Sequence, residues 1–124
     1  MHFALRSNKQ TALTALEEKL AAISDFNDCI FEAYGHYPPW EFKNDSELQS
    51  LYKSTYKELF AKEPKVVAIH AGLECGIFAS KIDGLDCIAI GPEMHDIHTV
   101  NEKLSISSTM DLYELILNIL EKSK

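Results

Sequence analysis

Two histidines and two carboxylates lie close together in the segment from Gly91 to Thr99. Glu93, His95, Asp96 and His98 fall within six residues, and imidazole nitrogens and carboxylate oxygens are atoms that bind zinc in proteins. Their spacing is not that of a common zinc motif, and a catalytic zinc takes about three protein ligands and keeps one open position. Three interpretations stay open: part of a larger metal site, a local zinc site made by these four side chains, or an ordinary solvated loop.

A second candidate site, His70 to Gly76, directly follows the apolar run Val66 to Ile69. Ligands of open α/β sheets bind at the carboxyl ends of strands, and a helix N-terminus offers N–H groups to an anion such as a substrate carboxylate. The glycines of this segment would let the backbone approach a ligand, but they also suit a tight strand-to-helix turn. Cys75 with His70 as its base would be a nucleophile, although packing of a small residue under the turn is the simpler interpretation.

Periodic apolar residues predict the helices that must position these segments. The predicted helices run from a Ser7-Asn8 cap to about Ser24, from a capping box at Asn44-Asp45-Ser46 with Gln49 to about Lys62, briefly within 72–82, and from Ser108-x-x-Asp111 toward the C-terminus.

Extended segments are predicted between these helices, at Phe3–Leu5, Cys29–Tyr34, Val66–Ile69 and Asp86–Ile90. The last two are continuously apolar, as in strands buried on both faces, and indicate a parallel sheet. The order is β-α-β, a proline-rich break at residues 35–40, and then α-β-α-β-α, which predicts the α/β class. The first β-α-β piece offers too few strands to stand alone.

The composition predicts one ordinary soluble domain. Of its 124 residues, 46% are apolar and 25% charged, so packing alone should stabilise a chain of this size without disulfides or metals. The net charge of −7 disfavours nucleic acid and anionic membranes as partners. No apolar stretch approaches the roughly 20 residues of a membrane span, the N-terminus does not resemble a secretory signal, and Cys29, Cys75 and Cys87 show no paired spacing. We therefore expect a cytoplasmic protein with reduced thiols.

Several motifs together resemble the C-terminal part of the aminoacyl-histidine dipeptidases, also called Xaa-His or cytosol nonspecific dipeptidases. These are two-zinc metallopeptidases related to carnosinase and carboxypeptidase G. The similarity covers nearly the whole chain and rests on Tyr37-Pro38-Pro39-Trp40, the segment 56–65, Val67 to Gly76, Ile90-Gly91-Pro92 and His98 to Ile106.

The resemblance implies two partial domains. Residues 1–40 match the second half of a ferredoxin-like lid, the domain that mediates dimerisation, and residues 41–124 match the C-terminal part of a zinc-peptidase catalytic domain. It also implies that His98 is a zinc ligand, whereas His95 and Asp96 have no matching role. Gly72, Leu73 and Glu74 correspond to the loop that lies near the substrate carboxylate. Thr99-Val100-Asn101 departs from the family's usual Ser-Pro-Asp, which affects the expected loop geometry.

Other parts of the family's active site have no counterpart here. The chain contains no His-x-Asp, and its one adjacent glutamate pair, Glu17-Glu18, lies in a predicted amphipathic helix. With one ligand of a two-zinc site and no general base, the chain alone should not hydrolyse a dipeptide. We therefore expect a fragment of a dipeptidase, with homo-oligomers and a dipeptide substrate in the parent enzyme. The alternative is a stand-alone binding or oligomerisation module on a decayed peptidase scaffold.

Overall fold

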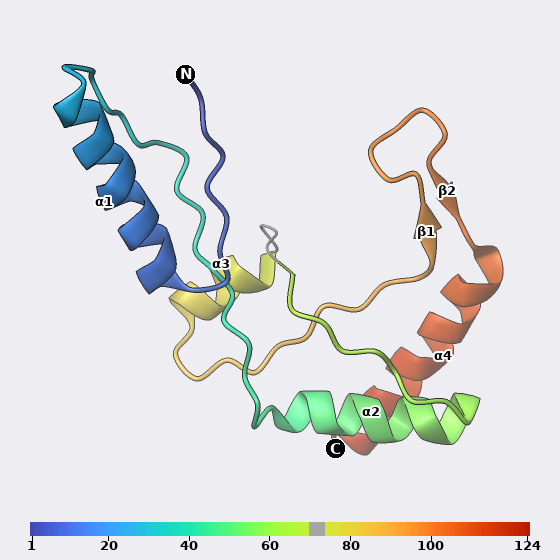
Figure 1. The fold of residues 1–124 in the computed structure, drawn as a ribbon. Coiled ribbons are helices and arrows are strands. Elements are labelled where there is room, and N and C mark those ends of the chain that lie inside the picture. The colour runs from blue at the N-terminus through green and yellow to red at the C-terminus, as the bar shows by residue number, and fades with distance from the viewer. Residues whose placement is uncertain (70–73) are drawn as a thin grey trace. The chain divides into compact units, whose positions relative to one another are not determined.

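A computed structural model describes residues 1–69 and 74–124 (Figure 1). The chain divides into two compact units, one made of Met1–Asp45 with Val67–Leu85 and the other of Ser46–Val66 with Asp86–Lys124. The predicted domain boundary at residue 40 stays a prediction. No helix in the described part of the chain combines the length and apolar character that a membrane crossing requires.

The described residues of the first unit form the helices α1 (Gln10–Phe26) and α3 (Glu74–Lys81). The predicted helices are confirmed in both places, but the predicted Ser7-Asn8 cap is wrong. Lys9 occupies the N-cap without a capping side chain, because the Ser7 hydroxyl instead accepts a hydrogen bond from the Lys9 N–H at 3.1 Å. No residue of α1 is buried, so its apolar face has no complete cover in this unit.

Gly76 marks the closest packing of the first unit. It is buried in α3, and a Cβ added there would lie 2.7 Å from the Pro38 carbonyl oxygen and 3.5 Å from the Trp40 Cβ. A glycine is thus required for α3 to lie against the turn Tyr37-Pro38-Pro39-Trp40, which we call the proline corner. The sequence suggests approach to a ligand or a tight strand-to-helix turn for the glycines of this segment, whereas Gly76 lies inside α3 and has a third role, close helix packing.

The second unit is built on α2 (Glu47–Phe60). Ser46 caps this helix by accepting a hydrogen bond from the Gln49 N–H at 2.9 Å, which confirms the predicted capping box start. An Asp86 carboxylate oxygen accepts from the Leu48 N–H at 2.9 Å, so a second side chain satisfies an N–H group at this helix end. The helix ends at Ala61, whose φ of 53° is left-handed.

The last helix, α4 (Ile106–Lys122), packs against α2 in the same unit (Figure 1). The predicted start at Ser108 is wrong, because Ser105 is the N-cap and its hydroxyl accepts from the Ser108 N–H. Thr55 of α2 is 0% exposed, and Leu115 and Ile119 of α4 are 2% and 8% exposed. The contact between α2 and α4 is therefore the core of this unit.

The predicted parallel sheet is not formed by the described residues. Their one sheet pairs β1 (Met94–His95) with β2 (Lys103–Leu104) in antiparallel register, with Met94 opposite Leu104. The segments predicted as strands, 3–5, 29–34, 66–69 and 86–90, have no strand structure. Parallel strands require neighbouring strands and helices on both faces, whereas Val67 and Ile69 are exposed here.

Few apolar side chains are buried in either unit. Among the described residues, Leu115 and Ile119 are the only buried apolar side chains. The expectation of one self-sufficient packed domain is therefore wrong for this structure.

Candidate functional site

His98, the predicted metal ligand, lies in the loop that joins β1 to β2. The side chain is exposed and its backbone φ is 66°, in the left-handed region that few residues other than glycine adopt. The His98 N–H donates to a Glu102 carboxylate oxygen at 2.8 Å. Glu102 therefore holds the backbone from which the imidazole projects.

Thr99 stabilises the same loop. Its N–H and its hydroxyl both donate to the Asp96 carbonyl, at 3.1 and 2.7 Å. Its carbonyl accepts from the Glu102 N–H at 3.2 Å, and its hydroxyl accepts from the Asn101 N–H at 3.2 Å. These bonds close a compact turn around His98, although the family's usual Ser-Pro-Asp is replaced.

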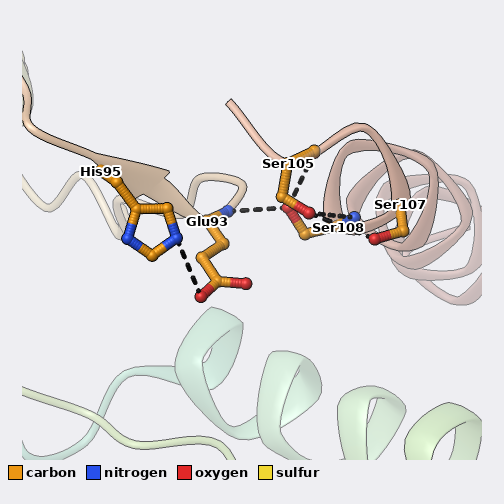
Figure 2. A network of polar contacts seen from close by, with 5 residues as sticks. All are labelled: Glu93, His95, Ser105, Ser107 and Ser108. Carbon is orange, nitrogen blue, oxygen red and sulfur yellow. Dashed lines mark hydrogen bonds and ion pairs between the residues drawn. The ribbon is translucent and has the colours of Figure 1, made fainter. Parts of the chain in front are cut away.

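A network of serines fixes the base of the hairpin to the start of α4 (Figure 2). The Glu93 N–H donates to the Ser108 hydroxyl at 2.9 Å, and the Glu93 carbonyl accepts from the Ser105 N–H at 3.0 Å. The Ser105 and Ser107 hydroxyls are 3.1 Å apart. Glu93 also places a carboxylate oxygen 3.3 Å from the His95 Nε2. The helix cap and the loop that contains His98 are thus parts of one hydrogen-bonded assembly.

The local zinc site predicted from Glu93, His95, Asp96 and His98 is not assembled. In the ranges 1–69 and 74–124, no three side chains of His, Cys, Asp or Glu lie close enough together to hold a metal ion. The strand β1 ends at His95, and left-handed backbone follows at Asp96 and His98, so the four side chains do not share one face of one element. These residues by themselves do not fit a zinc ion, and His98 is left as a single candidate ligand.

Two of the three predicted substrate neighbours, Gly72 and Leu73, lie outside the described residues, as does His70. Glu74 is the first residue of α3 and is exposed. It belongs to the first unit and His98 to the second, and the two are described separately.

Tyr37 is a neighbour of Glu74 that sequence reasoning did not select. Partial removal of the phenol from water raises the pKa of Tyr37, and the negative charges of Glu74 and of an ionised Cys75 raise it further. In the sequence Tyr37 belongs to the turn Tyr37-Pro38-Pro39-Trp40, whose aromatic residues indicate a packed corner and which forms part of the family resemblance. The structure adds that this corner lies beside the first turn of α3.

Comparison with known proteins is consistent with this arrangement of motifs. The sequence pattern of peptidase family M20/M25/M40 matches residues 6–122. The chain is 30% identical over 122 residues to the cytosol non-specific dipeptidase of Escherichia coli (strain K12), covering 98% of this chain and 25% of that protein. Its structure is similar to the crystal structure of aminoacylhistidine dipeptidase from Vibrio alginolyticus, with a TM-score of 0.81 and 27% identity over 94% of this chain and 24% of that one.

The chain spans about a quarter of the length of the relatives that it matches. Within that quarter the similarity is nearly continuous from end to end, and the fold agrees as well as the sequence. The resemblance to the dipeptidases is therefore confirmed, and the chain belongs to peptidase family M20/M25/M40.

Proposed function

We propose that this chain is one part of a zinc-dependent dipeptidase that hydrolyses Xaa-His and other dipeptides in the cytoplasm. The observation that carries the proposal is the similarity of 98% of the chain to a cytosol non-specific dipeptidase. The similarity to the solved aminoacylhistidine dipeptidase supports it independently through the fold.

Within such an enzyme the chain would supply His98 as one metal ligand. A histidine ligand must present an unprotonated ring nitrogen to the metal, and the exposed imidazole of His98 is accessible for this role. The bond from the His98 N–H to Glu102 orients the backbone at that position. Two bound zinc ions would polarise the scissile carbonyl and activate a water molecule.

The loop 72–74 would lie near the substrate carboxylate. Glu74 begins α3, an eight-residue helix, and Tyr37 lies beside it. Because the resemblance assigns no general base and one metal ligand, His98, to this sequence, we expect the chain to be inactive alone. By the same resemblance, residues 1–40 would form half of a ferredoxin-like lid through which the enzyme forms homo-oligomers.

A chimera tests the proposal. The matched quarter of the Escherichia coli relative is replaced by this chain, and hydrolysis of Xaa-His and other dipeptides is measured with zinc present. We expect activity in the chimera and a loss of more than about 100-fold with His98→Asn, since asparagine accepts left-handed backbone but removes the imidazole.

His95→Asn is the matched control, because His95 lies three residues away in the same hairpin and has no proposed ligand role. It should leave activity within about twofold of the unsubstituted chimera and leave the bound zinc unchanged, whereas His98→Asn should lower the zinc content measured by elemental analysis. A folded chimera without dipeptidase activity, or equal activity and zinc content in the two variants, would contradict the proposal.

A further inference from the structure

The loop between β1 and β2 contains two residues with left-handed backbone. The φ values of Asp96 and His98 are 52° and 66°. Residues with a Cβ seldom adopt this conformation, because the Cβ crowds the following carbonyl oxygen, and the conformation persists where surrounding contacts hold it. Every residue from 96 to 102 is exposed, so apolar packing does not provide those contacts. Hydrogen bonds within the loop must therefore maintain the left-handed conformation at His98.

Glu102 is placed to provide such a bond by the strand that follows it. It directly precedes β2, and the pairing of Lys103 with His95 fixes the start of that strand opposite the end of β1. The Glu102 N–H also donates to the Thr99 carbonyl at 3.2 Å, which closes a four-residue turn. Both constraints bring Glu102 back toward His98, whose N–H donates to the Glu102 carboxylate at 2.8 Å.

The bond between His98 and Glu102 differs in kind from the other bonds of the loop. A carboxylate that accepts from a backbone N–H forms a charge-assisted hydrogen bond, which is shorter and stronger than a bond between neutral groups. The Thr99 hydroxyl is neutral, and it donates to the Asp96 carbonyl at 2.7 Å. The Glu102 carboxylate instead binds the backbone of the proposed ligand itself.

Val100 makes the loop more dependent on such bonds. It is the second residue of the turn from Thr99 to Glu102, a position at which proline is favoured because its ring fixes φ near −65°. The family's usual Ser-Pro-Asp has proline there, whereas valine does not fix φ. The Val100 side chain is 101% exposed, so packing does not restrain it either. In this chain, hydrogen bonds to side chains must supply the order that proline would supply.

We propose that Glu102 is the positioning residue of His98, and that it acts through the hydrogen bond that its carboxylate accepts rather than through its charge. The ligand role of His98 rests here on the proposed function. By holding the His98 backbone before a metal binds, Glu102 removes part of the ordering that binding would otherwise have to impose. Residues that orient a metal ligand in this way commonly raise metal affinity by about 10- to 100-fold.

The first test uses the isolated chain and needs no metal. Exchange of the His98 amide with solvent is followed by NMR, because an N–H that donates a hydrogen bond exchanges more slowly than a solvated one. Glu102→Ala should speed this exchange at least about fivefold. Glu102→Gln should leave it within about twofold, since the amide oxygen of glutamine can accept the same bond. Glu114→Ala is the matched control, because it removes another exposed glutamate of the same unit, and it should leave the exchange unchanged.

The second test is zinc affinity, measured by competition with a chelator in the chimera with the Escherichia coli relative. Glu102→Ala should weaken zinc binding by at least about tenfold, and Glu102→Gln by less than about threefold. Adding Val100→Pro to Glu102→Ala should recover at least about threefold of the loss, since the proline ring restores part of the missing restraint on the loop. Glu114→Ala should leave the affinity unchanged.

Three results would overturn the positioning role. The first is a His98 amide that exchanges equally fast with and without Glu102→Ala. The second is an equal loss of zinc affinity in Glu102→Gln and Glu102→Ala, which would show that the charge supports the metal. The third is a chimera in which His98→Asn removes zinc but Glu102→Ala does not. A chimera in which His98→Asn leaves the zinc content unchanged would instead contradict the proposed function, and amide exchange in the isolated chain would still test Glu102.

Discussion

Tyr37 provides a test of the structure at the level of single residues. Its pKa lies above the ordinary value of about 10, because the phenol is partly removed from water and because Glu74 and Cys75 add negative charge nearby. Glu74→Gln should therefore lower the pKa of Tyr37, as measured from the phenolate absorbance of the protein minus that of Tyr37→Phe. Glu32→Gln, which removes another exposed carboxylate of the same unit, should leave it unchanged.

The sign of the effect on stability follows from the direction of the pKa shift. Between about pH 10 and the higher pKa of the folded state, the folded chain keeps a proton on Tyr37 that the unfolded chain has lost. The contribution of Tyr37 to stability is therefore complete below pH 10 and falls as the pH rises through that window. Equal phenol titrations of the protein with and without Glu74→Gln would show that Glu74 is not a neighbour of Tyr37.

Residue-scale features were predictable where their causes are local. The Ser46 cap was predicted because its partner, Gln49, is three residues away, and His98 was selected by a motif that surrounds it in the sequence. The N-cap of α4 was predicted wrongly because Ser105 and Ser108 are both plausible capping residues. In the structure the Ser108 hydroxyl accepts from the Glu93 N–H, and this contact is not local in the sequence. The electrostatic effect of Glu74 on Tyr37 joins residues 37 positions apart and has no local signal.

At the scale of elements, helices were predicted better than strands. A helix satisfies its hydrogen bonds within one segment, so the apolar periodicity and caps around 10–26, 47–60, 74–81 and 106–122 were sufficient to indicate four helices. A strand needs a neighbour in space. The apolar runs 66–69 and 86–90 indicated strands buried on both faces, but the described residues form only the β1–β2 pair.

Packing of α3 against the proline corner predicts the effect of a substitution at Gly76. In an open helix Gly→Ala stabilises by about 1 kcal/mol, but at Gly76 the new Cβ would lie 2.7 Å from the Pro38 carbonyl oxygen. We expect Gly76→Ala to destabilise the first unit by about 1–3 kcal/mol. Urea unfolding followed by the fluorescence of Trp40, the one tryptophan of the sequence, measures this unit directly.

Gly91→Ala is the control for that measurement. A Cβ at Gly91 would have no atom within 4 Å, so this variant should unfold at the same urea concentration as the original chain. A Gly76→Ala variant that is equally stable would mean that α3 does not approach the corner as closely as described. Gly35 and Gly84 are unsuitable controls because both have positive φ values.

For the whole molecule, composition alone gave a misleading expectation. An apolar fraction of 46% is enough to form a core, but composition does not specify which apolar residues face one another and which stay exposed. Phe3, Phe26 and Ile30 in the first unit and Ile106 in the second are all more than 60% exposed. The predicted order of elements does indicate this exposure, because the first β-α-β piece has too few strands to stand alone.

This uneven burial predicts uneven protection of backbone amides in the isolated chain. Local opening requires little free energy where few apolar contacts must be broken. The amides of α2 and α4, which enclose Thr55, Leu115 and Ile119, should exchange with deuterium most slowly. The amides of α1, which has no buried residue, should exchange at least about tenfold faster, since each 1.4 kcal/mol of opening free energy corresponds to a factor of ten.

Hydrogen exchange followed by mass spectrometry gives this comparison. Equal protection of α1 and α4 in the isolated chain would show instead that its stability is shared between the two units.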